Sequence, residues 1–138
     1  MSDFYLHTYD SDLMVPATGI ERLAAASCHG AMILALPFLL PLGIYILYPL
    51  LGGTSAYVRH QALQAMLFHL FFLFITTAFT SVTVFLLHII ILGWPFAAVT
   101  GLAGGIFFLW GCVVMVIATL RAFQGRPYRM PLVGGWGR

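Results

Sequence analysis

The sequence predicts an all-α integral membrane protein, a bundle of three transmembrane helices with a polar N-terminal arm and an extended C-terminal tail. Residues 60 to 120 contain no Asp, Glu, Lys or Arg, and a second uncharged stretch covers residues 23 to 58. Hydrophobic residues make up 62% of the 138 residues and charged residues 7%, against about 25% charged in average chains. A soluble domain of this size would lack a polar surface, whereas a helix of about 20 apolar residues crosses a bilayer.

Residues 1–18 are expected to form the polar arm, because they are acidic and aromatic and too short for a core of their own. No basic segment precedes an apolar one here, so the arm does not match a cleavable signal peptide. The segment from Thr18 to Glu21 matches a capping box, in which two side chains satisfy free backbone donors at a helix start.

The first predicted helix runs from Gly19 to Leu51, and its membrane span covers about residues 30–51. Pro37 and Pro41 lie inside it. We expect a kink or a broken turn there, because proline lacks the backbone donor that a helix interior needs. Gly52-Gly53 marks the predicted end of this helix.

The second span covers about residues 62–92 and the third about residues 96–120, with Gly93-Trp94-Pro95 as the turn between them. At 1.5 Å per residue the second span is about 46 Å long, which exceeds a hydrocarbon core of about 30 Å. It must tilt or keep its first turns at the headgroups, and the polar residues between Tyr57 and Gln64 suit the second arrangement. Gly125 is the expected C-cap of the third helix.

Residues 19–125 thus form the predicted transmembrane domain, and residues 126–138 form a tail on the cytoplasmic side. Three spans place the termini on opposite sides. The side of the arm carries all four acids and one Arg, and the side of the tail carries five Arg. Because basic loops stay in the cytoplasm, we expect the N-terminus outside and the C-terminus inside, in a bacterial inner membrane. A nucleic-acid partner is not expected, since no basic cluster lies with aromatics on a soluble element.

His29, His69 and His88 are the candidate cofactor ligands, since ionisable side chains within membranes are often functional. His69 and His88 are 19 residues, or about 28 Å, apart on one predicted helix and cannot share a haem. His29 and His88 fall on the same side in this topology and could together hold a haem iron, while a single His could ligate the magnesium of chlorophyll or bacteriochlorophyll. The interpretation that we favour is that each His bonds a carbonyl, a Thr or a headgroup.

A row of small residues on the third helix predicts a helix-packing face, where backbones approach closely. It includes a GxxxG pair. The sequence leaves open whether its partner is the first helix or another chain. The members of the row are Ala97, Gly101, Gly104, Gly105, Gly111 and Ala118.

The sequence indicates neither an enzyme nor a metal site. The predicted spans hold no carboxylate, and no set of nucleophile, base and orienting group appears. The two cysteines, Cys28 and Cys112, do not form a CxxC pair and are predicted to lie too far apart for a disulfide. Threonines between Thr76 and Thr83 could line a polar path, but we favour hydrogen bonds within the bundle.

Three segments carry a resemblance to a known family. They are Glu21-Arg-Leu-Ala-Ala-Ala-Ser-Cys-His29, Tyr57-Val-Arg-His-Gln-Ala-Leu-Gln-Ala65 and Arg121-Ala-Phe-Gln-Gly-Arg-Pro-Tyr-Arg-Met-Pro-Leu132. Together, over about residues 19–134, they resemble the bacterial small membrane proteins of unknown function that are related to the chloroplast inner-envelope import component, the Tic-twenty-like family. The resemblance implies a membrane bundle of three or four helices without established enzymatic activity, and its plant relatives act in protein translocation.

These observations favour a non-enzymatic accessory or structural subunit of a larger membrane complex, with the lipid bilayer and other membrane subunits as partners. A photosynthetic or respiratory assembly is the expected host, by association with such small helical subunits. Two alternatives stay open. One is a haem- or chlorophyll-binding subunit that uses the transmembrane histidines, and the other is a protein-translocation or channel component.

Overall fold

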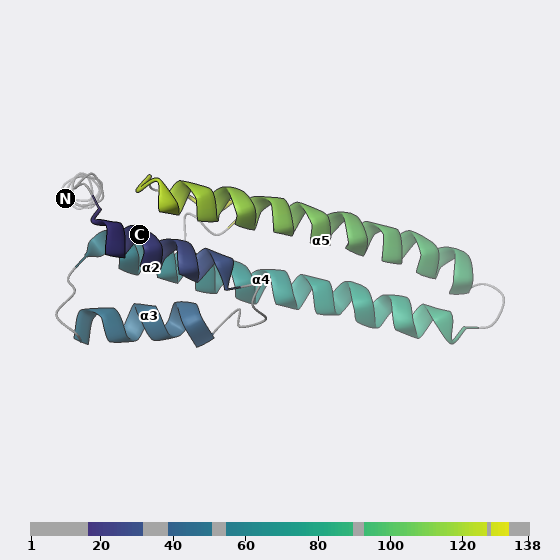
Figure 1. Ribbon diagram of the computed structural model, residues 1–138. Helices are drawn as coiled ribbons and strands as arrows, with labels where there is room; N and C mark the ends of the chain where they lie inside the picture. The colour runs from purple at the N-terminus through teal and green to yellow at the C-terminus, as the bar shows by residue number, and fades with distance from the viewer. Residues whose placement is uncertain (1–16, 32–38, 51–54, 90–92, 127, 133–138) are drawn as a thin grey trace, which may run out of the picture. The chain divides into compact units, whose positions relative to one another are not determined.

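A computed structural model describes residues 17–31, 39–50, 55–89, 93–126 and 128–132 of the chain, the side chains of residues 48–50 excepted (Figure 1). Its helices are α2 (Gly19–Gly30), α3 (Leu39–Leu50), α4 (Ala56–Leu87) and α5 (Gly93–Phe123). The described residues contain no strand, so the predicted all-α class is confirmed. The predicted arm up to residue 16, the Gly52-Gly53 break and the last six residues of the tail lie outside the described part of the chain.

The start of α2 carries the predicted capping box. The Thr18 backbone N–H donates to Glu21 Oε2 at 2.6 Å, and the Glu21 N–H donates to Thr18 Oγ1 at 3.3 Å. Both side chains therefore satisfy backbone donors that the first helical turn leaves free, and this prediction is confirmed.

In the place of the interrupted first helix predicted from Gly19 to Leu51, the structure describes two helices of 12 residues each, so a single span there is not confirmed. α2 ends before Pro37, which lies among the residues that the structure does not describe. Pro41 is the third residue of α3, in the first turn, where a missing N–H removes no intrahelical bond. α2 and α3 pack against one another.

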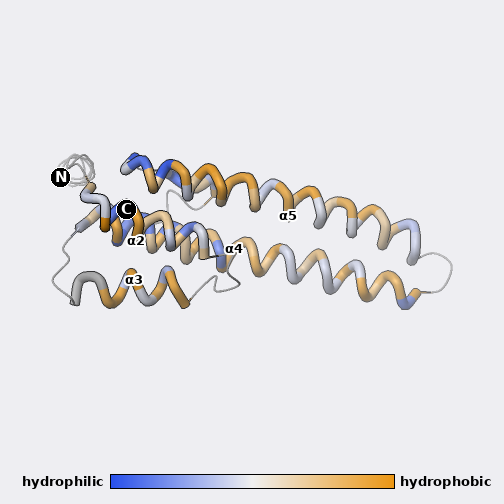
Figure 2. The backbone as a smooth tube through the Cα atoms, viewed as in Figure 1, coloured by the Kyte–Doolittle hydropathy of each residue, from blue (hydrophilic) through white to orange (hydrophobic). Residues whose placement is uncertain are grey.

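α4 and α5 are the described helices that are long and apolar enough to cross a membrane, with 32 and 31 residues. In an apolar stretch of 18 residues within each helix, 6% of the residues of α4 and 22% of those of α5 are buried within the chain, whereas a core helix of a soluble protein is mostly buried. Figure 2 shows apolar residues along most of both helices and hydrophilic ones near the C-terminal end of α5. At 12 residues, or about 18 Å, α2 and α3 are each too short to cross a core of about 30 Å.

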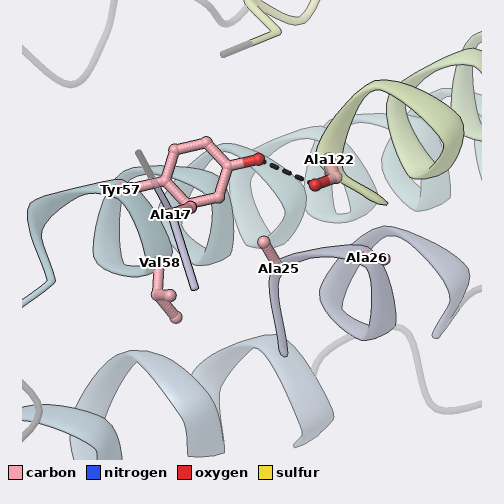
Figure 3. Close-up of a cluster of buried hydrophobic side chains, with 6 residues drawn as sticks. All are labelled: Ala17, Ala25, Ala26, Tyr57, Val58 and Ala122. Atoms are coloured by element: carbon pink, nitrogen blue, oxygen red, sulfur yellow. Dashed lines mark hydrogen bonds between the residues drawn. The ribbon is translucent and has the colours of Figure 1, made fainter. Parts of the chain in front are cut away.

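The chain divides into two compact units, to which α4 and α5 both contribute. Unit 1 comprises the residues up to His69 and from Met115 onward, and unit 2 comprises Leu70–Val114. The main apolar core of unit 1 is a cluster of small residues around one tyrosine ring, drawn in Figure 3. Its members are Ala17, Ala25, Ala26, Tyr57, Val58 and Ala122. Small side chains here bring α2, the start of α4 and the end of α5 into close contact.

α5 ends at Phe123, and Gly125 caps it, as the sequence predicts. Gly125 has a φ of +71°, a conformation that glycine adopts without the steric cost of a Cβ. Its N–H donates to the Ala122 carbonyl at 3.0 Å, and the Arg126 N–H donates to the Arg121 carbonyl at 3.0 Å. This pair of bonds is the Schellman arrangement, which satisfies the last carbonyls of the helix and turns the chain back.

Candidate functional site

Unit 1 encloses a polar cluster at the contact between α2 and α4. The His29 side chain is fully buried, and its Nε2 lies 2.8 Å from Oε1 of Gln61, which is also fully buried. Because an amide oxygen can only accept, Nε2 carries the proton and donates it. This bond joins residues 32 positions apart and aligns α2 with α4.

A second buried pair continues the cluster along α4. The side chains of His60 and Gln64 lie one helical turn apart, with their Nε2 atoms at 2.8 Å. The Gln64 amide N–H donates to the His60 ring nitrogen, since an amide nitrogen cannot accept. Gln64 Oε1 accepts the backbone N–H of Met130 at 3.0 Å. Gln64 thereby joins α4 to the segment that follows α5, and the Met130 side chain is buried there.

His69 completes the cluster, with 1% of its surface exposed. Burial lowers the pKa of His29 to about 4, although the bond to Gln61 favours its charged form; His69 and His60 lower this pKa further. His29 is therefore neutral near pH 7, with its proton on Nε2. Its Nδ1 atom and the Nε2 atom of Gln61 are buried without a hydrogen-bond partner.

The cluster has the chemistry of a hydrogen-bonded core more than that of a metal centre. In the part of the chain that the structure describes, no three His, Cys, Asp or Glu side chains come together as metal ligands. His88 belongs to unit 2, is exposed, and has its Nδ1 atom 2.7 Å from the Val84 carbonyl. Ligation of a haem or a chlorin by His29, His69 or His88 stays a prediction, which an absorption spectrum of the purified protein tests.

Sequence reasoning missed the glutamines that hold this cluster. The polar residues between Tyr57 and Gln64 suited a position at the headgroups, yet His60, Gln61 and Gln64 are 0 to 7% exposed. The spacing carried a signal, because Gln61, Ala65 and His69 are four residues apart and lie on one helix face. His29 was recognised as a candidate site residue, but its partner Gln61 was not.

Unit 2 contains a cavity of about 300 Å³ between α4 and α5. Hydroxyls line it from both helices: Thr83 Oγ1 lies 3.0 Å from Thr100 Oγ1, and Thr80 Oγ1 donates to the Thr76 carbonyl at 2.9 Å. Since the Thr100 hydroxyl donates to the Phe96 carbonyl at 3.0 Å, Thr83 is the donor to Thr100. These bonds stay within the hairpin, as the favoured interpretation of the threonines expects.

The small-residue row on α5 faces α4, a partner that the sequence left unnamed. A Cβ on Gly104 would lie 3.1 Å from the Phe79 Cβ atom, and a Cβ on Gly101 would lie 3.6 Å from the Thr83 methyl group. A Cβ on Gly111 would overlap the ring of Phe72. Nothing lies within 4 Å of such an atom on Gly105, so the GxxxG pair of the sequence contributes one contacting glycine. Ala97 and Ala118 are buried, in unit 2 and unit 1 respectively.

Aromatic rings fill the rest of the contact between α4 and α5 within unit 2. The rings of Phe72 and Phe107 stack with centroids 5.4 Å apart, and Phe71 meets Phe107 edge to face at 6.5 Å. Such pairs contribute about 0.5–1.5 kcal/mol beyond their area burial. Glycines at the helix crossing and aromatics beside it therefore hold the hairpin together.

Comparison with known proteins finds a family model that matches most of the chain. The model of a family described as the magnetosome magnetite crystal formation protein family, MamF/MmsF, matches residues 20–136. No curated protein and no solved structure matches the chain.

The resemblance to the Tic-twenty-like family is wrong, because this family model covers all three segments on which it rested. Those segments supply the packing of unit 1: they hold Arg22, Tyr57, Gln61 and Gly125, each of which has a structural role in the fold. Residues that are required for helix packing and helix capping can recur in different families that share an arrangement of helices. Such residues therefore do not identify one family. The translocation alternative, which followed from the plant relatives, loses its basis.

Proposed function

The chain belongs to the MamF/MmsF family of magnetosome magnetite crystal formation proteins, and we propose that it is a non-enzymatic component of the magnetosome membrane that acts in magnetite crystal formation. The observation that carries this proposal is the extent of the match. Residues 20–136 include nearly all of α2 and the whole of α3, α4 and α5. The proposal replaces the photosynthetic or respiratory host expected from the sequence.

The membrane part of the proposal rests on the surfaces of α4 and α5. Large apolar side chains on both helices are exposed, among them Phe74 at 70% and Val99 at 67%. Exposed apolar surface on this scale is unfavourable in water and suits contact with acyl chains. Other subunits of the same membrane are the partners that we expect beside the lipid.

The non-enzymatic part rests on what the described polar side chains do. Four of the buried ones in unit 1 bond to one another or to the backbone: His29 bonds to Gln61, and Gln64 bonds to His60 and to the Met130 backbone. Glu21, the acid among the described residues, caps α2. These are structural contacts, and they support a role through assembly in the membrane and not through turnover of a substrate.

The test is deletion of the gene in a magnetite-forming bacterium, followed by complementation with the wild-type chain. Electron microscopy of the crystals measures their number, length and shape, and immunoblots of isolated magnetosomes and of the remaining membrane measure where the chain resides. We expect altered crystals in the deletion strain, restored by complementation, and enrichment of the chain in magnetosomes. Crystals that are unchanged by deletion, or a chain absent from magnetosomes, would contradict the proposal.

A complementing variant sharpens this test. Gly111→Leu forces a large side chain against Phe72 and should separate α4 from α5, whereas Gly105→Leu points into open space. If the role depends on the assembled hairpin, the first variant fails to restore the crystals and the second restores them. Equal membrane levels of the two variants, measured by immunoblot, exclude a difference in insertion.

A further inference from the structure

The first described residue of the chain lies beside the start of α4 and the end of α5. Ala17 is buried in one cluster with Tyr57, Val58 and Ala122. The Arg22 Nε–H donates to the Ala17 carbonyl at 2.9 Å, and a Cβ on Gly125 would lie 2.8 Å from the same Nε atom. All these residues belong to unit 1, so their contacts place the beginning of α2 and the end of α5 at one level.

The described contacts of α2 and α3 with α4 lie in the first part of α4. Cys28, near the end of α2, is buried with Ala62 and Ala65, and Ile44 and Tyr45 of α3 pack on the same cluster. Ala65 lies six residues beyond the exposed Arg59, a rise of about 9 Å. A hydrocarbon core is about 30 Å thick. If Arg59 marks the headgroup level, the contacts with Ala62 and Ala65 lie within the nearer leaflet.

The outward sides of α2 and α3 are apolar. Ile20 and Leu23 on α2 are 77% and 59% exposed, and Leu39, Ile46 and Leu47 on α3 are 72%, 50% and 54% exposed. Apolar surface of this kind on two adjacent helices calls for an apolar environment. Lipid is the environment that is continuous with these helices, since they pack directly on α4, a helix that can cross the membrane.

The distribution of the arginines indicates which end of the α4–α5 hairpin lies at the headgroups. Five arginines lie among the described residues of unit 1, and Glu21 is the one acid among them. Residues 88–89 and 93–95, at the turn between α4 and α5, carry no Arg, Lys, Asp or Glu. Arginine side chains reach from a helix end to the headgroups. The arginines are Arg22, Arg59, Arg121, Arg126 and Arg129.

We propose that α2 and α3 are embedded through their exposed apolar side in the acyl chains of a single leaflet, the one on the arginine side, and do not cross the bilayer. The membrane is then crossed by α4 and α5. Gly19 and Arg126 lie on the same face of the membrane, and Trp94 lies on the opposite face. By the positive-inside rule the arginine face is cytoplasmic. The inference rests on the contacts of unit 1 and is independent of the proposed function.

This arrangement differs in one measurable respect from the three-span topology that the sequence predicts. In the three-span topology Gly19 and Trp94 share the outer face and Arg126 lies inside. A single crossing by α2 and α3 would need the start of α2 and the start of α4 on opposite faces. The contacts of Ala17 with Tyr57 and Val58 place both starts together.

The experiment uses single-cysteine variants of the full chain in a background with Cys28→Ala and Cys112→Ala. The three variants are Gly19→Cys, Arg126→Cys and Trp94→Cys. No atom lies within 4 Å of a Cβ on Gly19, Arg126 is exposed, and Trp94 is 68% exposed, so each thiol is accessible. A membrane-impermeant maleimide is added to spheroplasts and to inverted membrane vesicles. We expect Gly19→Cys and Arg126→Cys to label in the vesicles and Trp94→Cys to label in the spheroplasts. Labelling of Gly19→Cys together with Trp94→Cys overturns the proposal.

A depth measurement tests the leaflet itself. A fluorophore is attached to Leu47→Cys on α3 and, in a second protein, to Leu102→Cys on α5 as a reference within the α4–α5 hairpin. Both leucine side chains are exposed in the structure. The labelled proteins are reconstituted into liposomes. Lipids with a nitroxide at a shallow or a deep acyl position quench the label. We expect shallow nitroxides to quench the Leu47 label more than deep ones, by at least about twofold. The absence of lipid quenching at Leu47 would show that water or protein covers α3 and would overturn the proposal.

Discussion

The hydroxyl of Tyr57, in the first turn of α4, donates to the carbonyl of Ala122, near the end of α5, at 2.9 Å (Figure 3). The two residues are 65 positions apart, and both are buried. The carbonyls of a last helical turn have no intrahelical partner unless another group donates to them. The Ala122 carbonyl also accepts the Gly125 N–H, so the Tyr57 hydroxyl adds a second bond to it and ties the start of one long helix to the end of the other.

Tyr57→Phe should destabilise the protein by about 1 kcal/mol, since it removes a buried hydrogen bond and little volume. The expected loss is a lower unfolding midpoint in detergent, without loss of membrane insertion. Tyr128→Phe is the matched control, because Tyr128 is only half-buried. Equal stability of the two variants would mean that the bond to Ala122 contributes nothing measurable.

Gln61→Leu should cost about 1–3 kcal/mol, because it leaves the buried Nε2 donor of His29 without an acceptor. His29→Leu leaves Gln61 unpaired and should cost a similar amount. The double variant removes both polar groups, so it should be less destabilised than the sum of the single variants. Chemical unfolding of the four proteins closes this double-mutant cycle. Additive losses would show that the two side chains do not interact.

The stability of the protein should fall as the medium becomes acidic, because burial holds the pKa of His29 at about 4, below its ordinary value of 6.5. Between these values the unfolded chain binds a proton that the folded chain does not. The contribution of the neutral His29 to the free energy of unfolding is therefore complete above about pH 6.5, declines toward pH 4 and is lost below it. The total loss is about 3 kcal/mol.

Thermal unfolding between pH 4.5 and 7.5 measures this dependence, with His29→Gln as the control that keeps a polar side chain and removes the titration. His60 and His69 lie in the same cluster and remain in both proteins, so the difference between the two pH profiles reports His29. Parallel profiles would contradict the assignment.

Gly111→Ala should destabilise the hairpin of unit 2, since the added methyl group would overlap the ring of Phe72. The cost of such overpacking is typically about 1–3 kcal/mol. Gly105→Ala introduces the same methyl group into open space, and it should leave stability unchanged or raise it slightly through helix propensity. Partial recovery of Gly111→Ala by Phe72→Leu would locate the clash. If both alanine variants unfold alike, the row does not pack as described.

The sequence predicted those parts of the fold that depend on local signals. Thr18 and Glu21 make a capping box whose partners are three residues apart, and Gly125 ends α5 through bonds to the preceding turn. Both can be found from spacing alone. The uncharged stretch from residue 60 to 120 likewise allowed the two long helices to be predicted, because a run of consecutive apolar residues is enough to recognise a membrane-spanning helix.

The division of the first predicted helix into α2 and α3 could not be predicted, because length and hydropathy do not show whether an apolar segment forms one interrupted helix or two separate ones. Two apolar helices of 12 residues have the same composition as one interrupted span, and contacts far along the chain distinguish them. Ile44 packing on Ala62 is such a contact. The partner of His29 was missed for the same reason, because His29 and Gln61 are 32 residues apart and a glutamine at a helix start is usually solvated.

The bond from the Met130 N–H to Gln64 bears on how the arginines after α5 meet a charged surface. A basic segment on a flexible linker can reach anionic groups at varying distances from the helices and can dissociate from them without moving the helices. Here the chain is turned back by Gly125 and fastened to α4 five residues later, so Arg126 is held between two fixed points. The position of its charge is therefore fixed relative to α4 and α5 within unit 1, and a force that a charged surface exerts on Arg126 is transmitted to the helices of that unit.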